Sequence, residues 1–198
     1  MRKLLLAALL TASASVGAFA QGTIAFDNQF NTNASPSATS SGYVFSPTTG
    51  LPETGKFNLE LYGGPSAGTM TLIARLLQSD GSALSGADIG ASGQWIDVTG
   101  QSYIVPGVPA LGVGFFEVQA WEGNFSSYAA AEIGLGIFGN SGIFQNPTGG
   151  GSVSAPDLIG MPSFFLCPDC PEPGTLALCG LGAASLLFFR RKKRNTGL

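Results

Sequence analysis

The stretch Phe57-Asn58-Leu59-Glu60-Leu61-Tyr62 decides the fold class, because apolar and polar side chains alternate along it. A period of two places Phe57, Leu59 and Leu61 on one face of an extended strand and the intervening side chains on the other. A helix would bring apolar residues together every three or four positions instead. The stretch therefore predicts a β-strand that presents one apolar face to a core.

The same alternation returns in residues 115–121, where Phe116, Val118 and Ala120 share one side. Glycine and proline separate this segment from other short runs rich in β-branched and aromatic residues. The predicted strands cover residues 23–26, 42–45, 57–62, 70–74, 94–98, 102–105, 115–121 and 163–166. Short strands with turn residues between them predict an all-β fold, either a sandwich or a jelly-roll-like arrangement.

One short helix is expected within this β-rich body. Residues 127–133 read Ser-Tyr-Ala-Ala-Ala-Glu-Ile, and Ser127 is a suitable N-cap for one or two helical turns. Residues 31–41 and 146–155 are rich in Ser, Thr, Asn, Gly and Pro, so they predict long loops.

Charge is scarce and unevenly placed along the 198 residues. Charged residues make up 11% of the chain, against roughly 25% in an average soluble domain. Residues 21–189 hold all twelve acids but only two of the nine cations, Lys56 and Arg75, so this segment carries a net charge of −10. It cannot neutralise a run of phosphates, which excludes nucleic acid as a partner.

The residue types of catalytic sites are missing or badly spaced. The chain has no histidine, which excludes histidine-dependent catalysis and disfavours a catalytic zinc site. Glu117 and Glu122 are five residues apart, so one regular strand would point them to opposite sides, unlike a glycosidase pair. The acids are spread singly without an Asp-x-Asp-x-Asp-Gly loop, so calcium binding is the weaker alternative. We predict a protein that is not an enzyme and has no cofactor or metal site.

Residues 1–20 have the order of a secretory signal peptide. A basic start precedes an apolar core over residues 4–10, and Ala18 and Ala20 are the small residues that signal peptidase accepts at −3 and −1. Cleavage after Ala20 would make Gln21 the new N-terminus. A buried N-terminal helix is the alternative interpretation.

Near the C-terminus, residues 175–189 form an apolar run of 15 residues. As a helix this run spans about 22 Å, less than the ~30 Å hydrocarbon core of a bilayer. The cations that follow it act as a stop-transfer signal that stays in the cytoplasm. Long basic side chains and local bilayer thinning can absorb the mismatch. The stop-transfer residues are Arg190, Arg191, Lys192, Lys193 and Arg194. We predict a transmembrane helix with residues 21–174 outside and residues 190–198 inside.

The segment before this run contains Pro171, Glu172, Pro173 and Gly174. Pro-Glu-Pro, a short apolar helix and a basic cluster in this order resemble the PEP-CTERM sorting signal of Gram-negative bacteria. The resemblance implies that exosortase, an integral-membrane protease-transpeptidase, recognises this tail and cuts it near the Pro-Glu-Pro residues. It also implies transient residence in the inner membrane, followed by transfer to the cell surface or the extracellular polymer matrix. A permanent single-span anchor is the alternative.

The body carries a second resemblance. Residues 61–65, Leu-Tyr-Gly-Gly-Pro, followed by residues 116–121 and by Ser127-Tyr128, resemble the ectodomain common among PEP-CTERM proteins of planctomycete- and verrucomicrobium-type bacteria. This resemblance implies a sandwich-like domain and supplies no activity. The predicted organisation is a signal peptide (1–20), a β-sandwich-like ectodomain (21–166), a Cys/Pro linker (167–174), a transmembrane helix (175–189) and a basic tail (190–198).

Cys167 and Cys170 have the CxxC spacing within a proline-flanked segment. Outside the cytosol, a local disulfide between them is the favoured interpretation. Unpaired cysteines are an alternative, as is a redox or metal function. A metal site would need a second pair, and the third cysteine, Cys179, lies in the apolar run.

Phe115 and Trp121 could form a sugar-stacking stripe with Glu117 and Gln119, because all four face the same side of one strand. The alternative is that both faces of the strand are covered and Trp121 belongs to the core, as buried tryptophans often do in sandwiches. We therefore expect a structural or adhesive surface protein associated with exopolysaccharide. A carbohydrate-binding module on the cell surface is the alternative function.

Overall fold

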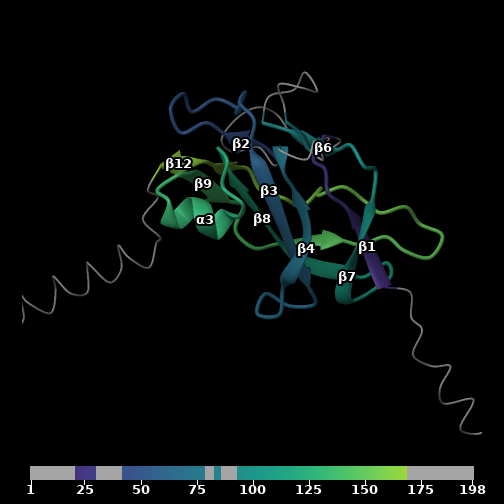
Figure 1. The fold of residues 1–198 in the computed structure, drawn as a ribbon. Coiled ribbons are helices and arrows are strands. Elements are labelled where there is room, and N and C mark those ends of the chain that lie inside the picture. The colour runs from purple at the N-terminus through teal and green to yellow at the C-terminus, as the bar shows by residue number, and fades with distance from the viewer. Residues whose placement is uncertain (1–20, 30–41, 79–82, 86–92, 169–198) are drawn as a thin grey trace, which may run out of the picture. The chain divides into compact units, whose positions relative to one another are not determined.

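A computed structural model describes residues 21–29, 42–78, 83–85 and 93–168, and these residues form a β-rich domain (Figure 1). The strands in these ranges are β1 (Gln21–Ala25), β2 (Val44–Phe45), β3 (Asn58–Gly64), β4 (Thr71–Leu76), β5 (Ala83–Ser85), β6 (Trp95–Asp97), β7 (Ser102–Pro109), β8 (Val113–Trp121), β9 (Ile137–Asn140), β10 (Phe144–Pro147), β11 (Phe164–Phe165) and β12 (Cys167–Pro168). One helix, α3 (Tyr128–Ile133), accompanies them. The all-β prediction is confirmed.

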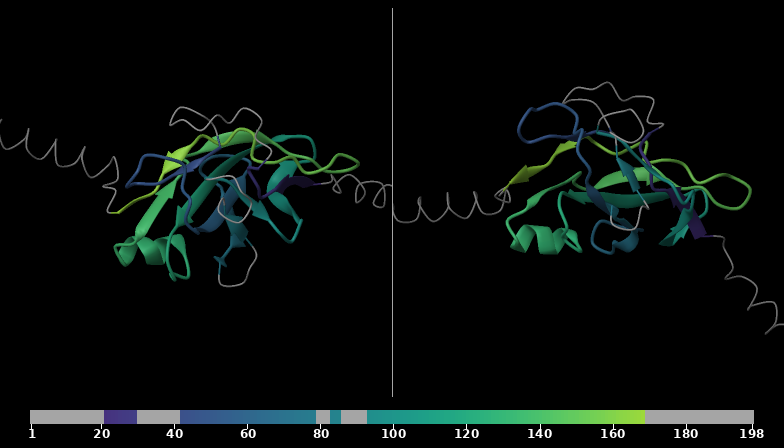
Figure 2. Two further views of the ribbon diagram at one scale, coloured as in Figure 1. Left: turned by 90° about the horizontal axis from the view of Figure 1, so that it is seen from above. Right: turned by 45° about the horizontal axis from the view of Figure 1, so that its top comes forward.

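A six-stranded sheet is the main layer of the domain. Its order is β12-β9-β8-β3-β4, and β10 pairs with β8 on the same side as β9. The central pair is antiparallel, with Leu59 opposite Ala120 and Leu61 opposite Val118. Three two-stranded sheets accompany it: β1–β7, the parallel pair β2–β11, and β5–β6. Both turned views show α3 and β12 at one end of the domain and β1 with β7 at the other (Figure 2).

The main core lies on one face of the large sheet, as the alternation predicts. Phe57, Leu59 and Leu61 are buried, and so are Phe116, Val118 and Ala120 from β8; the smaller sheets add residues such as Ile24, Val44 and Val105. Trp95 is fully buried here, packs edge-on against Phe26 and Phe57, and donates a 3.0 Å hydrogen bond from its indole to the Phe26 carbonyl. Burial of these apolar side chains supplies the main driving force for the fold.

A smaller apolar cluster covers one end of the opposite face. Trp121 and Phe138 from the large sheet pack with Ala131 of α3, and Phe125 lies against them. The helix begins as predicted, since the Ser127 hydroxyl accepts a 3.1 Å hydrogen bond from the Ala130 amide. This bond satisfies one of the amides that a helix start leaves without an intrahelical partner. The helix therefore shields one end of the sheet from solvent.

Strands β9 and β10 were not predicted, and one serine joins them along the edge of β8. Asn140 pairs with Gln119 and Phe144 pairs with Phe116, so the register shifts by one residue between them. Ser141 spans the irregularity: its amide donates to the Val118 carbonyl at 2.9 Å, and its hydroxyl accepts from the Val118 amide at 2.9 Å. A side chain thus replaces a ladder bond at a bulge.

The large sheet extends beyond the predicted end of the ectodomain at residue 166. Cys167 pairs with Phe138 and Pro168 pairs with Ile137, so these residues form a strand rather than part of a linker. The chain divides after Pro168 into two units, and the second, residues 169–198, lies outside the described residues. The predicted signal peptide and the predicted transmembrane helix at 175–189 also lie outside them. Within the described ranges, no helix is long and apolar enough to cross a bilayer.

Candidate functional site

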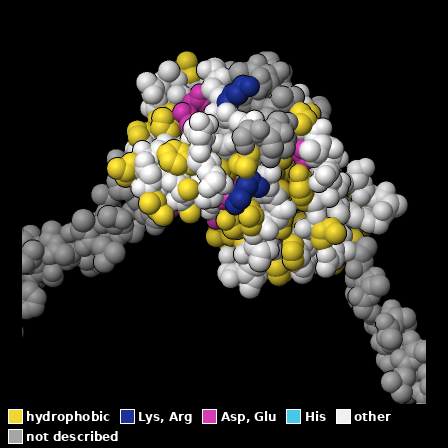
Figure 3. Space-filling model, in the orientation of Figure 1, with side chains coloured by type: hydrophobic (Ala, Val, Ile, Leu, Met, Phe, Trp, Pro, Cys, Tyr) yellow, Lys and Arg dark blue, Asp and Glu magenta, His cyan; other side chains and the backbone are white. Residues whose placement is uncertain are grey.

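An ion pair lies in the middle of the outer face, the face of the large sheet opposite the main core. Arg75 stands opposite Glu60 across the β3–β4 pair, and their side chains approach to 2.5 Å. Glu60 is 2% exposed, whereas Arg75 is 40% exposed. Figure 3 shows little basic surface on this side of the molecule, and acidic side chains lie beside the basic patch near its centre. The Glu60 carboxylate is therefore shielded from solvent, and the Arg75 guanidinium that pairs with it is the hydrated group.

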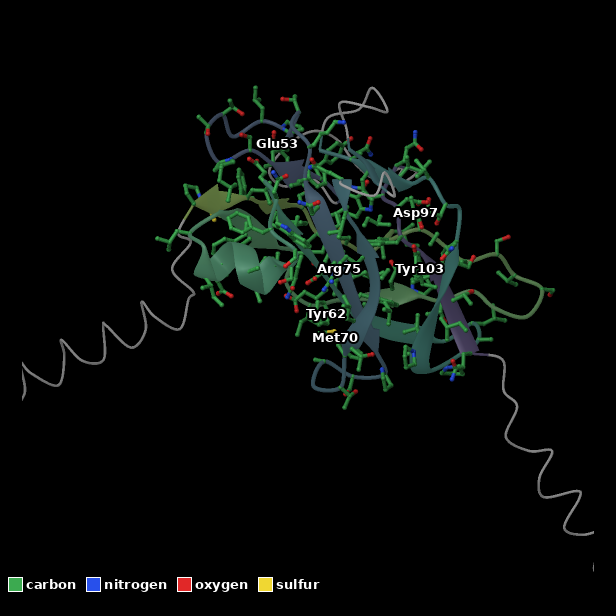
Figure 4. All side chains as sticks on the ribbon, in the orientation of Figure 1. Glu53, Tyr62, Met70, Arg75, Asp97 and Tyr103 are labelled. Atoms are coloured by element: carbon green, nitrogen blue, oxygen red, sulfur yellow. The ribbon has the colours of Figure 1, made fainter. Side chains whose placement is uncertain are left out.

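Tyr62 lies beside this ion pair, and its neighbours determine its chemistry. Figure 4 shows Tyr62 and Arg75 on neighbouring strands, with Met70 close to Tyr62. Partial burial raises the pKa of the Tyr62 phenol, and the Glu60 carboxylate, which also accepts its hydrogen bond, raises it further. Tyr62 therefore stays protonated at neutral pH, and its side chain is partly exposed.

The neighbouring strand β8 adds two more polar side chains to this face. Glu117 stands opposite Tyr62, and Gln119 stands opposite Glu60. The Gln119 amide donates a 3.3 Å hydrogen bond to the Glu117 carboxylate, and both side chains are partly exposed. We call Glu60, Tyr62, Arg75, Glu117 and Gln119 the outer-face cluster. It combines an aromatic ring with donors and acceptors suited to hydroxyl groups.

The predicted stacking pair of Phe115 and Trp121 is not an exposed aromatic stripe. The alternation placed Trp121 on the outer face correctly, but its side chain is fully buried beneath the α3 segment. Its indole donates a 2.9 Å hydrogen bond to the Phe125 carbonyl, so its polar atom is also satisfied. Phe115 is half-buried. No sugar ring can stack on Trp121 in this arrangement, and the core interpretation of Trp121 is the one the structure supports.

A second group of carboxyls gathers between β1, β6 and the segment before Leu158. Burial, a hydrogen bond with Asp157 and the adjacent carboxyls of Asp157 and Asp97 together raise the pKa of Asp27 to about 7. Asp97 is held by the Tyr103 hydroxyl at 2.7 Å and by the amide and hydroxyl of Thr99 at 2.9 and 2.7 Å (Figure 4). Among the described residues, no group of three or more Asp, Glu, Cys or His side chains is arranged to hold a metal ion.

The predicted processing residues lie at or beyond the edges of the described domain. Gln21, the predicted new N-terminus, is exposed at the start of β1. Cys167 is disulfide-bonded. Cys170 lies outside the described residues, so its pairing with Cys167 stays a prediction. Ala18, Ala20, the Pro171–Gly174 motif and the Arg190–Arg194 cations lie outside them too.

The outer-face cluster was missed at the sequence level, although part of its signal was present. The alternation placed Glu60 and Tyr62 on the same face of their strand, and it placed Glu117 and Gln119 on the same face of theirs. What the sequence lacked was the strand order, which makes β8 and β4 the two neighbours of β3. Arg75, the second cation of the acidic segment, could have been singled out as the counter-ion of a buried acid.

Comparison with protein families matches residues 169–193 to the PEP-CTERM protein-sorting motif. The match covers the Pro-Glu-Pro residues, the apolar run and most of the basic cluster, and it begins directly after β12. Comparisons with curated proteins and with solved structures found no match. The resemblance of the tail is thereby confirmed, whereas the taxonomic resemblance of the body stays a prediction.

Proposed function

Because the chain carries a PEP-CTERM sorting motif and is therefore an exported substrate of exosortase, we propose that its body is a structural or adhesive component of the cell surface. The position of the motif supports this proposal most directly, because the motif begins at residue 169, immediately after β12 of the large sheet. The folded domain and the sorting signal thus adjoin without an intervening domain. Signal peptidase removes residues 1–20, and exosortase cuts near Pro171-Glu172-Pro173.

The charge of the body fits a weakly interacting matrix component. Residues 21–189 carry a net charge of −10, and Lys56 and Arg75 are their only cations. Such a surface opposes self-association at low ionic strength, while divalent cations screen or bridge it. An association with exopolysaccharide would therefore strengthen when a divalent cation is added. Extraction of the matrix with a chelator, compared with extraction in sodium chloride, tests this dependence.

Intact mass of the surface-released protein tests the processing. We expect loss of residues 1–20 and of the tail beyond the Pro-Glu-Pro motif when exosortase is present. Replacing Glu172 with Ala should leave the tail attached, whereas Asp169→Asn, a charge change at the start of the matched segment, should be processed. The proposal fails if the mature protein stays in the inner membrane with Arg190–Arg194 intact, which would support a permanent anchor instead.

The alternative function, carbohydrate binding, is favoured by the outer-face cluster. Tyr62 offers a partly exposed ring, and Glu117 and Gln119 offer acceptors and donors beside it. The net charge of the cluster is negative, which favours neutral glycans over acidic ones. Affinity electrophoresis in gels containing neutral polysaccharides should show retardation that Tyr62→Ala abolishes. Phe165→Ala removes a more exposed ring from another sheet, and loss of retardation in that control would contradict a site at Tyr62.

A further inference from the structure

The turn between α3 and β9 holds a leucine in a backbone conformation that usually belongs to glycine. Leu135 has a φ of +54°, in the left-handed region. The Gly136 amide donates to the Ala131 carbonyl at 2.8 Å, and the Leu135 amide donates to the Glu132 carbonyl at 3.3 Å. These two bonds define a Schellman helix end, whose left-handed position favours glycine. Leu135 is nevertheless 72% exposed, so burial in the core does not explain its presence there.

The neighbouring glycines fix the direction of this turn. A Cβ on Gly134 would lie 2.5 Å from the Phe125 ring, and one on Gly136 would lie 2.8 Å from it. Both glycines therefore pack directly against Phe125, and Leu135 is the residue between them that can carry a side chain. Ile133, the last residue of α3, is 83% exposed. We call Ile133 and Leu135 the apolar tip.

The apolar tip lies where the described chain ends. Leu135 is two residues before Ile137, and Ile137 pairs with Pro168, the last residue of β12. Only residues 169–174 separate Pro168 from the apolar run that begins at Thr175. Fully extended, this connection spans at most about 25 Å. An anchored tail would therefore keep the tip within reach of the headgroup layer, which is several ångströms thick on each side of the hydrocarbon core.

We propose that Ile133 and Leu135 insert into the outer surface of the lipid bilayer while the tail is still anchored. This inference rests on the proposed function, because it requires the apolar run to be in the membrane. The tether supplies a high local concentration, so two apolar side chains suffice for contact. The only charge among the residues of α3, β9 and their connecting turn is Glu132, which is exposed. The contact is therefore apolar, and it favours a zwitterionic lipid surface over an anionic one.

Contact at the tip would orient the domain on the membrane. The domain would also leave the bilayer as soon as exosortase removes the tail. Two side chains without a tether bind a bilayer more weakly than a single myristoyl chain, which is itself only a marginal anchor. Removal of the tail therefore frees the domain without a separate release step.

Introduced tryptophan tests the contact in the full chain reconstituted into phosphatidylcholine vesicles. The native Trp95 and Trp121 are fully buried, and the quenching of the wild-type chain is subtracted as background, because Trp121 packs with Phe125 near the tip. Leu135→Trp should show blue-shifted emission that brominated acyl chains reduce by about half, as expected for a side chain in the interface. Leu111→Trp is the matched control, because Leu111 also has a positive φ of +59° and is 64% exposed. It lies in the turn before β8, at the end of that strand away from Trp121.

A second variant separates loss of contact from loss of folding. Leu135→Gly removes the side chain and relieves the left-handed strain, so the fold should be kept or slightly stabilised. An Ile133→Trp reporter should be quenched less in the Leu135→Gly background than with Leu135 in place. Failure of the chain to float with the vesicles would contradict the anchor itself. Flotation with equal quenching at positions 135 and 111 would overturn the apolar tip alone.

Discussion

The Arg75 guanidinium lies 2.5 Å from the carboxylate of Glu60, and Glu60 is 2% exposed while its partner reaches solvent. A carboxylate this deeply buried stays charged only where a cation compensates its lost hydration. The described domain has Lys56 and Arg75 as its cations, and one of them is placed here. The pair therefore holds β3 to β4 on the outer face, across from the core.

Replacing Arg75 with Met should destabilise the domain by about 2–3 kcal/mol, because it leaves the Glu60 carboxylate buried and unpaired. The double variant Glu60→Gln/Arg75→Met should recover most of this loss. Urea unfolding followed by tryptophan fluorescence measures both. Lys56→Gln removes the same charge from an exposed position and should change stability by less than about 0.5 kcal/mol. If Arg75→Met lowered the free energy of unfolding no more than Lys56→Gln, the Glu60–Arg75 pair would be a surface contact that does not stabilise the domain.

The sequence predicted those parts of the fold that depend on local pattern. The alternation in residues 57–61 and 116–120 identified the core face, and Ser127 identified the helix start; both are confirmed. These features depend on side-chain periodicity or on a cap within three residues, so a single sequence contains them.

The sequence could not predict features that arise only when distant segments meet. Residues 137–140, Ile-Phe-Gly-Asn, are a weak strand by composition, and they become β9 because β8 offers a free edge. Trp121 faces away from the main core as the alternation requires, but the α3 segment covers it. The Glu60–Arg75 pair needs the β3–β4 register, which includes an irregularity at Leu61/Tyr62 that no pattern reveals.

Gly139 should be the most sensitive glycine near the C-terminal end of the domain. An added Cβ there would lie 2.1 Å from the Phe165 carbonyl oxygen, which belongs to the backbone and cannot rotate away. Gly139→Ala should therefore separate β9 from the β11 segment and cost about 1–3 kcal/mol. Gly68→Ala is the matched control, because an added Cβ at Gly68 meets nothing within 4 Å. If both variants unfold at the wild-type urea concentration, the close approach of β9 and Phe165 is absent in solution.

Asn28 should be sensitive to substitution, because its buried side chain ties three segments together. Its amide donates to the Gly42 carbonyl, and its oxygen accepts a 2.7 Å hydrogen bond from the Trp95 amide. Asn28→Leu leaves that buried amide unpaired and should cost about 1–3 kcal/mol. Asn140→Leu removes an asparagine that is exposed, and it should cost clearly less. A shift in Trp95 emission in the Asn28 variant alone would place the structural change beside Trp95. Equal decreases in the free energy of unfolding for both variants would contradict the role given to Asn28.

Stability should fall as the pH rises from about 4 to about 8, and Asp27 is the cause. Burial and the carboxyls of Asp157 and Asp97 raise the pKa of Asp27 from 3.8 to about 7 in the folded protein. Between these values the folded state binds a proton that the unfolded state has released, so the free energy of unfolding decreases with rising pH. Because Asp27 is only partly buried, we expect a change on the order of 1 kcal/mol.

Asp27→Asn tests this pH dependence, because it keeps the shape of the side chain and removes its titration. Urea midpoints at pH 5 and pH 8 should differ less in this variant than in the wild type, and the variant should be the more stable protein at pH 8. Glu132→Gln removes one negative charge from an exposed position of α3 and should leave the wild-type difference in place. If the urea midpoints of Asp27→Asn differ between pH 5 and pH 8 as much as those of the wild type, other carboxyls cause the pH dependence. A fall in stability from pH 5 to pH 8 that is larger in Asp27→Asn than in the wild type would contradict the raised pKa of Asp27, because an acid whose pKa is raised by folding can only lower stability as it ionises.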